Sequence, residues 1–159
     1  MRSKTLQTLV LTALFGLGAG AESEAVDFGD YTSETLTTKA WLALIAEEPD
    51  LALVYTAKCI ELYAKEALKM QASLTAYAPK DNVFNYWALN DVGTCYFITG
   101  EALLQKKQWA EAHAAYETCI RDFSYSQCWD PKGWFWKPAV GARGKANKIR
   151  AEYPEAVQS

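Results

Sequence analysis

Residues 99–120 read TGEALLQKKQWAEAHAAYETCI, and this stretch decides the fold. Small and apolar side chains recur at three- and four-residue steps on both sides of the polar triplet at 106–108, which is the spacing of one face of an α-helix. The stretch therefore predicts two helices joined by a tight turn. Such helices cross closely only where small side chains receive large ones, and we expect Gly100 and Ala112 to receive the ring of Tyr116.

Five of these positions follow one another at defined intervals. Gly100 precedes Trp109 by nine residues, and Trp109 precedes Ala112 by three. Tyr116 follows Ala112 by four residues, and Cys119 follows three residues later. In these intervals the stretch resembles the tetratricopeptide repeat (TPR), in which a small residue on the first helix faces aromatic and small residues on the second. The resemblance implies that the five residues form the packing between the two helices.

A second and poorer copy of the pattern lies 60 residues earlier in the chain. Its matching positions are Ala40, Ala52, Thr56, Cys59 and Ile60, and Pro49 stands in place of the turn aromatic. The spacing between the copies is not the family's own period, and Ser124 stands where the family has the proline that ends a repeat. The resemblance thus covers one good unit, one degenerate unit and a capping helix at 134–150. The alternative is an irregular helical bundle in which one hairpin carries the motif by chance.

The apolar spacing along the rest of the chain predicts an all-α fold. We expect antiparallel helical hairpins stacked as a short TPR-like right-handed array. Its five helices are expected at about 33–46, 50–77, 82–105, 109–123 and 134–150, with a loop at 124–133. No strand is expected, because alternation of apolar and polar residues is absent. The helical domain spans 32–151, between a flexible lead-in at 22–31 and a frayed tail at 152–159.

Residues 1–21 have the three-part layout of a secretory signal peptide. Arg2 and Lys4 precede an uncharged apolar run at 6–18, and small residues lead up to Ala21. We expect cleavage after Ala21 and a periplasmic or secreted protein, and a buried N-terminal helix is the alternative. The run is shorter than the about 20 residues that a membrane span needs, so no transmembrane span is expected after cleavage. Loss of the two cations changes the net charge from −3 to −5, which does not favour nucleic acid as a partner.

The chain has four cysteines, Cys59, Cys95, Cys119 and Cys128. An even number of cysteines in an exported chain allows disulfides. Three of the four lie on apolar helical faces, where free thiols would pack as small hydrophobic groups. Both alternatives remain open. No two cysteines are closely spaced, so no metal site is expected.

The sequence contains none of the motifs that mark common catalytic sites. Phosphate-binding glycine loops, serine elbows and metal-spaced histidines are missing. His113 and Cys119 lie six residues apart, which places them well apart around a helix. We therefore expect a protein that is not an enzyme and holds no cofactor.

Polar residues of the third predicted helix are candidates for contact with a partner. They are Asn85, Asn90, Asp91, Thr94 and Glu101. The TPR resemblance implies a protein-protein interaction module of the cell envelope, an adaptor whose concave surface is lined by first-helix residues and holds a protein or peptide. A stack of this size must use its long helices as caps or form a homodimer.

Aromatic residues gather between 123 and 136, and Trp129, Trp134 and Trp136 stand within eight residues. Exposed indoles would present stacking faces to a glycan or small ligand, which is the alternative function. Rings that fold back would instead form a hydrophobic lid over the end of the helix stack.

Overall fold

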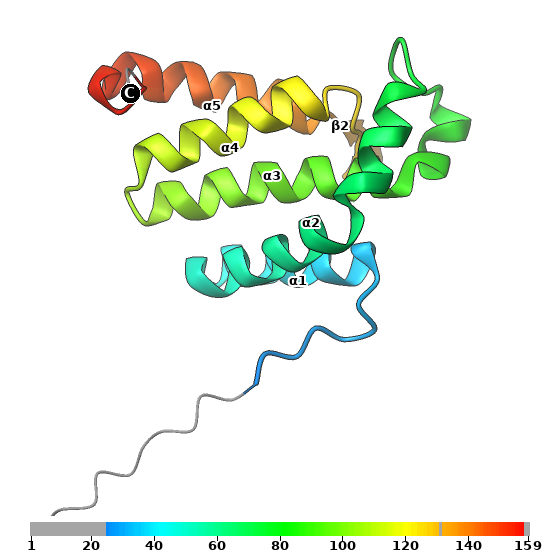
Figure 1. Ribbon diagram of the computed structural model, residues 1–159, viewed down its shortest axis with the longest axis horizontal. Helices are drawn as coiled ribbons and strands as arrows, with labels where there is room; N and C mark the ends of the chain where they lie inside the picture. The colour runs from blue at the N-terminus through cyan, green and yellow to red at the C-terminus, as the bar shows by residue number, and fades with distance from the viewer. Residues whose placement is uncertain (1–24, 131, 158–159) are drawn as a thin grey trace, which may run out of the picture.

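The computed structural model describes residues 25–130 and 132–157. The predicted signal peptide, residues 22–24 of the lead-in and the last two residues of the tail lie outside this part of the chain. The described residues form five α-helices, so the all-α prediction is confirmed (Figure 1). The helices are α1 (Ser33–Ile45), α2 (Pro49–Ala72), α3 (Trp87–Gln105), α4 (Trp109–Asp122) and α5 (Pro138–Glu152). Two 3₁₀-helices, η1 (Lys80–Tyr86) and η2 (Pro154–Val157), and two short strands, β1 (Cys128–Asp130) and β2 (Trp134–Trp136), complete the fold.

The helices form two hairpins and a last single helix, arranged in sequence order. Helices α1 and α2 pair, α3 and α4 pair, and α5 packs on α4 (Figure 1). Helix α3 lies at the centre and contacts all four other helices. Because α1 and α5 both contact α3, the first helices of the successive pairs lie next to one another.

The two helical hairpins turn in the same way. Glu47 and Lys107 each have φ of 59°, the left-handed conformation that commonly ends a helix. In the first turn the N–H of Glu48 donates to the carbonyl of Ala43, and in the second the N–H of Gln108 donates to the carbonyl of Leu103, each over 2.9 Å. The two turns lie sixty residues apart, as do the two copies of the sequence pattern.

Helices α3 and α4 make the close contact that the sequence predicts. A Cβ placed on Gly100 would lie 2.3 Å from Cε1 of Tyr116, so the ring occupies the space that a larger residue would need. Ala112, Tyr116 and Cys119 are fully buried beside it. The corresponding residues of the first hairpin, Ala40, Ala52, Thr56 and Cys59, are buried as well.

The elements between 72 and 87 differ from the expected continuous helices. Helix α2 ends at Ala72 instead of about 77, and 80–86 form a 3₁₀-helix rather than the start of α3. The reason is tertiary: the Gln71 side chain donates to Ser124 Oγ (2.9 Å) and accepts from the N–H of Tyr125 (3.0 Å). The same loop holds the chain after α2, because the Tyr125 hydroxyl donates to the carbonyl of Thr75 (2.9 Å) and the Gln127 amide donates to the carbonyl of Ala78 (3.0 Å).

The prediction that the chain contains no strand is wrong. Trp129 pairs with Phe135 at the centre of an antiparallel hairpin, β1–β2. Each strand has three residues, too few for an alternating pattern to show in the sequence. The last helix consequently begins at Pro138 rather than near 134.

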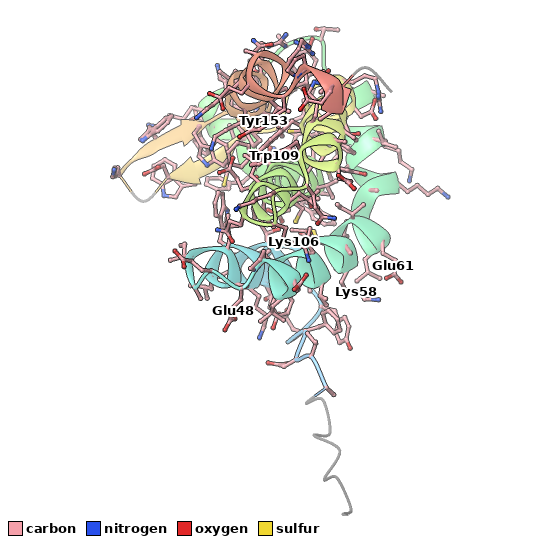
Figure 2. All side chains as sticks on the ribbon, turned by 90° about the vertical axis from the view of Figure 1, so that its left-hand side faces the viewer. Glu48, Lys58, Glu61, Lys106, Trp109 and Tyr153 are labelled. Atoms are coloured by element: carbon pink, nitrogen blue, oxygen red, sulfur yellow. The ribbon has the colours of Figure 1, made fainter. Side chains whose placement is uncertain are left out.

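Both described ends of the chain are anchored. Phe28, in the predicted lead-in, packs edge-on against Tyr55, and the Tyr63 hydroxyl donates to the carbonyl of Tyr31 over 2.8 Å. At the other end Tyr153 stacks on Trp109, with ring centroids 4.2 Å apart. Figure 2 shows this pair at the loop end of α3 and α4.

A candidate binding groove

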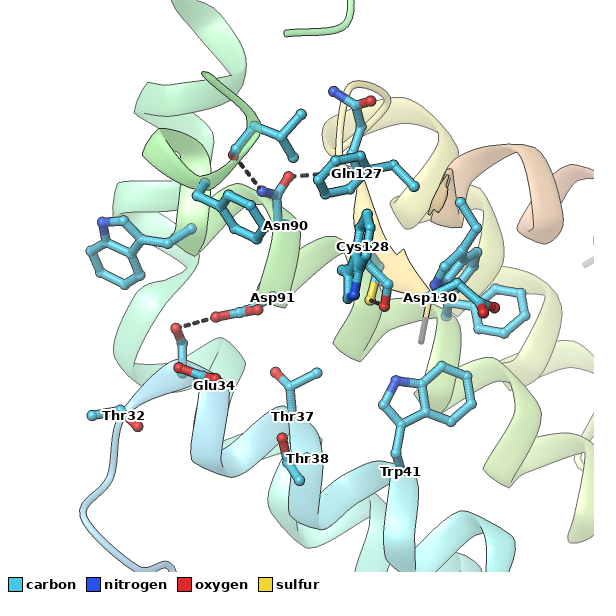
Figure 3. A pocket seen from close by; sticks show the side chains of 18 of the residues that line it. Thr32, Glu34, Thr37, Thr38, Trp41, Asn90, Asp91, Gln127, Cys128 and Asp130 are labelled. Carbon is cyan, nitrogen blue, oxygen red and sulfur yellow. Dashed lines mark hydrogen bonds between the residues drawn. The ribbon is translucent and has the colours of Figure 1, made fainter. Parts of the chain in front are cut away.

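A groove of about 1160 Å³ opens between three walls. The first wall is α1 with its N-cap residue Thr32, the second is η1 with the first half of α3, and the third is the β1–β2 hairpin (Figure 3). Figure 2 shows why the walls enclose a space: the hairpin projects from the helix stack on the same side as α1. This concave region is called the groove below.

Nine aromatic side chains line the groove. They are Trp41, Tyr63, Phe84, Trp87, Phe97, Trp129, Trp134, Phe135 and Trp136. Several large apolar residues of the groove remain exposed to solvent, notably Phe84 (68%), Trp134 (53%) and Trp129 (45%). Large exposed apolar patches on soluble proteins mark sites of interaction. The groove therefore has the surface of a binding site.

The aromatic residues of the hairpin divide into two roles. Trp136 folds back between Trp41 and Phe97, with ring centroids at 6.1 and 5.0 Å. Trp129 and Trp134 stay exposed in the groove. Thus Trp136 folds back onto the helices, as the lid alternative predicts, whereas the other two indoles remain about half exposed.

Residues on one stripe of α1 form part of the groove that sequence reasoning did not identify. Ser33, Thr37, Trp41 and Ile45 follow one another at four-residue steps and all line the groove. The neighbouring stripe of α1, which includes Leu36 and Ala40, faces the core. The four-residue spacing beside a clear core face was the signal in the sequence that could have revealed this wall.

Asn90 lines the groove, although its amide makes hydrogen bonds within the chain, whereas Thr94 does not line it. The Asn90 amide donates to the carbonyl of Val83 (2.8 Å) and accepts from the N–H of Gln127 (2.9 Å). Thr94 is fully buried and donates to the carbonyl of Asn90. Asn90 is therefore a clamp that joins η1 to the segment that leads into β1, and it holds two walls of the groove together.

Asp91, the next residue of α3, also lines the groove, with its carboxylate toward α1 (Figure 3). The Ser33 hydroxyl of α1 donates to Asp91 Oδ2. Burial raises the pKa of the Asp91 carboxyl to about 6, the Ser33 hydrogen bond opposes the rise, and the nearby Glu34 carboxylate adds to it. The groove therefore contains an acid whose charged form is poorly compensated.

The remaining predicted contact residues lie elsewhere. Glu101 accepts a hydrogen bond from the Tyr116 hydroxyl (2.6 Å) and pairs with Lys145 (2.8 Å), so it ties α3 to α4 and α5. Asn85 is exposed on η1 and does not line the groove. Neither residue shares a site with Asp91.

All four cysteines are free thiols in this structure. Cys59 and Cys95 both lie beside the Thr37 hydroxyl, and Cys119 donates to the carbonyl of Gly93 over 3.3 Å. Burial raises the pKa of the Cys119 thiol to about 12 and also raises the pKa of Cys128, which lines the groove. The Cys119 and Cys128 thiols therefore stay protonated near neutral pH, and the thiol is the unreactive form.

His113 lies on α4, where it contacts Arg150 and Glu117 rather than a groove residue. Across residues 25–130 and 132–157, no three His, Cys, Asp or Glu side chains come together as ligands for a metal. Among the helices that the structure describes, none has the length and apolar character for a membrane crossing.

Comparison of the chain with protein-family models, with curated proteins and with solved structures finds no match.

Proposed function

We propose that this chain is a non-enzymatic interaction module, a TPR-like adaptor of the periplasm or cell envelope that holds a segment of a partner protein in the groove. The observation that carries the proposal is the aromatic groove itself, with exposed indoles at Trp129 and Trp134. Burial of such an apolar surface by a partner is favourable, because it removes the surface from water.

The arrangement of the hairpins supports a repeat-like protein. The two turns share their backbone geometry, and the matched packing positions are buried in both hairpins. The TPR resemblance implies a binding face lined by first helices, and the groove is lined by α1 and α3. The proposed export to the envelope rests on the leader sequence at residues 1–21.

The size of the groove favours a polypeptide segment over a small metabolite. Pockets for small ligands measure about 300–1,000 Å³. The groove, at about 1160 Å³, exceeds this range. It therefore accommodates several side chains of an extended segment.

The test is selection of phage-displayed random peptides of about twelve residues on the purified chain. Synthetic versions of the selected peptides are then titrated into the wild-type protein and into a variant with Trp129→Ser and Trp134→Ser. We expect the affinity to fall at least about tenfold in this variant, since both indoles lose their contact area.

Leu68→Ser is the matched control, because Leu68 is exposed on α2 and lies outside the groove. This substitution should leave peptide affinity unchanged. Selected peptides that bind the double tryptophan variant as tightly as the wild type would show that the groove is not the binding site.

A second candidate function is glycan binding, which the exposed faces of Trp129 and Trp134 favour. Indole faces stack on sugar rings. The two residues stand on opposite faces of one short hairpin, because Trp129 pairs with Phe135 and Trp134 pairs with Asp130. Titration with cellohexaose, xylohexaose and chitohexaose, followed by tryptophan fluorescence, tests this function. A saturable shift that Trp134→Ala abolishes would support glycan binding over peptide binding.

A further inference from the structure

All the charged residues that line the groove are acidic. Glu34, Asp91 and Asp130 contribute carboxylates from α1, α3 and β1. Within the described part of the chain, no Lys, Arg or His side chain lines the groove. A groove that is both acidic and rich in aromatic faces has the electrostatic character that complements a cation.

We propose that the groove recognises a cationic side chain, a Lys or Arg of the partner segment, and this inference rests on the proposed function. The charge of that side chain lies against Asp91 and Glu34, and its aliphatic stem lies along the aromatic rings. The positions of the acids support this placement. Asp91 faces α1 across the floor of the groove, and Glu34 and Thr37 lie opposite to it (Figure 3).

Asp91 points to a cationic ligand, because the stability of the fold alone does not favour a buried carboxylate at this position. Within the described residues its one hydrogen-bond donor is the Ser33 hydroxyl, and no basic side chain pairs with it. An Asn of the same shape would accept the same hydrogen bond without the cost of burying a charge. A cation from a partner would supply the compensation that the chain itself lacks.

The aromatic rings account for the choice of Lys or Arg over a small inorganic cation. Trp87 and Tyr63 pack edge to face at 5.5 Å, and both line the groove near α3. Cations bind favourably over the faces of such rings, and the long stems of Lys and Arg pack on apolar surface. Elsewhere on this molecule the same preference is seen, where Lys137 Nζ lies 3.9 Å from the centre of the Tyr77 ring.

Two other occupants are less compatible with the charge and geometry. The predicted lead-in after residue 21 is acidic and would be repelled. A second copy of this chain would have to insert its basic helix α5 into the groove. Such a contact joins two different surfaces of the chain. Such contacts produce rings or open filaments instead of a closed dimer. Light scattering of the purified chain tests for this self-association.

The decisive experiment uses the groove-dependent peptides from the phage selection. We expect each of them to contain a Lys or Arg, and replacement of that residue by the uncharged norleucine should weaken binding to the wild-type chain by about tenfold or more. For the Asp91→Asn variant the same replacement in the peptide should change the affinity much less, because the carboxylate that pairs with the peptide cation is missing. Glu111→Gln, an exposed acid outside the groove, is the matched control.

The outcomes separate this inference from the proposed function. Peptides that depend on Trp129 and Trp134 but contain no cation, and bind Asp91→Asn as well as wild type, would overturn the cationic preference and leave the adaptor intact. If no selected peptide depends on the groove, or the chain associates with itself through it, both proposals fail.

The affinity for the Lys peptide should also depend on pH. Asp91 is faced by Glu34 from α1, by Cys128 from β1 and by Cys95 from its own helix, and none of these is a cation. With a pKa of about 6, protonation of Asp91 competes with the cation, so binding should be about tenfold weaker at pH 5 than at pH 7.5. The norleucine peptide should not show this dependence, and an equal dependence for both peptides would contradict the role of Asp91.

Discussion

The ring of Tyr116 fills the position that a side chain on Gly100 would occupy, with the nearest ring carbon 2.3 Å from the place of a Cβ. The Tyr116 hydroxyl donates a hydrogen bond to Glu101, and Lys145 of α5 also donates to the Glu101 carboxylate. One aromatic side chain of α4 therefore determines how closely α3 approaches and connects three helices of the stack.

Gly100→Ala should lower the free energy of unfolding by about 2–3 kcal/mol, although alanine is the better helix former, because the ring has no room to move aside. Gly144→Ala is the control, since nothing lies within 4 Å of a Cβ at that position of α5, and it should gain about 0.5–1 kcal/mol. Urea unfolding measures both. Equal effects of the two substitutions would mean that α3 and α4 do not cross closely.

Asn90→Ala should cost about 2–3 kcal/mol, because the carbonyl of Val83 and the N–H of Gln127 lose their common partner inside the protein. The substitution should also weaken peptide binding, since η1 and the hairpin are walls of the groove. Asn85→Ala, on the exposed side of η1, should stay within about 0.5 kcal/mol of the wild type. A stable Asn90 variant would show that the clamp is dispensable.

Asp91→Asn should stabilise the protein at neutral pH and not in acid. The native pKa of about 6 lies above the ordinary value of 3.8, so the folded chain binds the proton more tightly than the unfolded chain. Wild-type stability therefore falls as pH rises from about 4 to 6, and the variant avoids this loss. We expect a gain of about 2 kcal/mol at pH 7.5 and almost none below pH 4, measured by urea unfolding. A gain that is independent of pH would rule out titration of Asp91 as its cause.

Trp136→Ala and Trp134→Ala should separate stability from binding on one hairpin. Trp136 packs between Trp41 and Phe97, and its loss should cost about 2 kcal/mol. Trp134 is half exposed, so its loss should cost less than about 0.5 kcal/mol while it reduces peptide affinity. Thermal unfolding and the peptide titration together measure the two effects. The reverse pattern would mean that the lid and the binding face have been assigned to the wrong residues.

The helices and their close crossing were predictable because their causes are local. The three- and four-residue spacing of apolar residues and the small residues at Gly100 and Ala112 are visible in the sequence. The β1–β2 hairpin was not predictable, since three-residue strands leave no periodic signal. The path of the chain after α2 depends on Tyr125 and Gln127, about fifty residues away, which donate to the carbonyls of Thr75 and Ala78.

The candidate site was predictable in part. Trp129 and Trp134 stood out as a local concentration of aromatic residues, and Asp91 as a polar residue on α3, and all three line the groove. Asn90 also lines the groove, but the hydrogen bonds of its amide to backbone groups of two distant segments were not predictable, because no local pattern reveals them. The α1 wall was missed because its stripe lies next to a core face that already explained the helix.

The stack of Tyr153 on Trp109 affects how the array can grow. The two rings lie almost parallel, with centroids 4.2 Å apart, at the turn that joins α3 and α4. Another hairpin added after α5 would have to remove Tyr153 from this position and expose the indole. The stack therefore fixes the end of α5 against the first turn of α4, and η2 turns back onto α4 instead of extending the array.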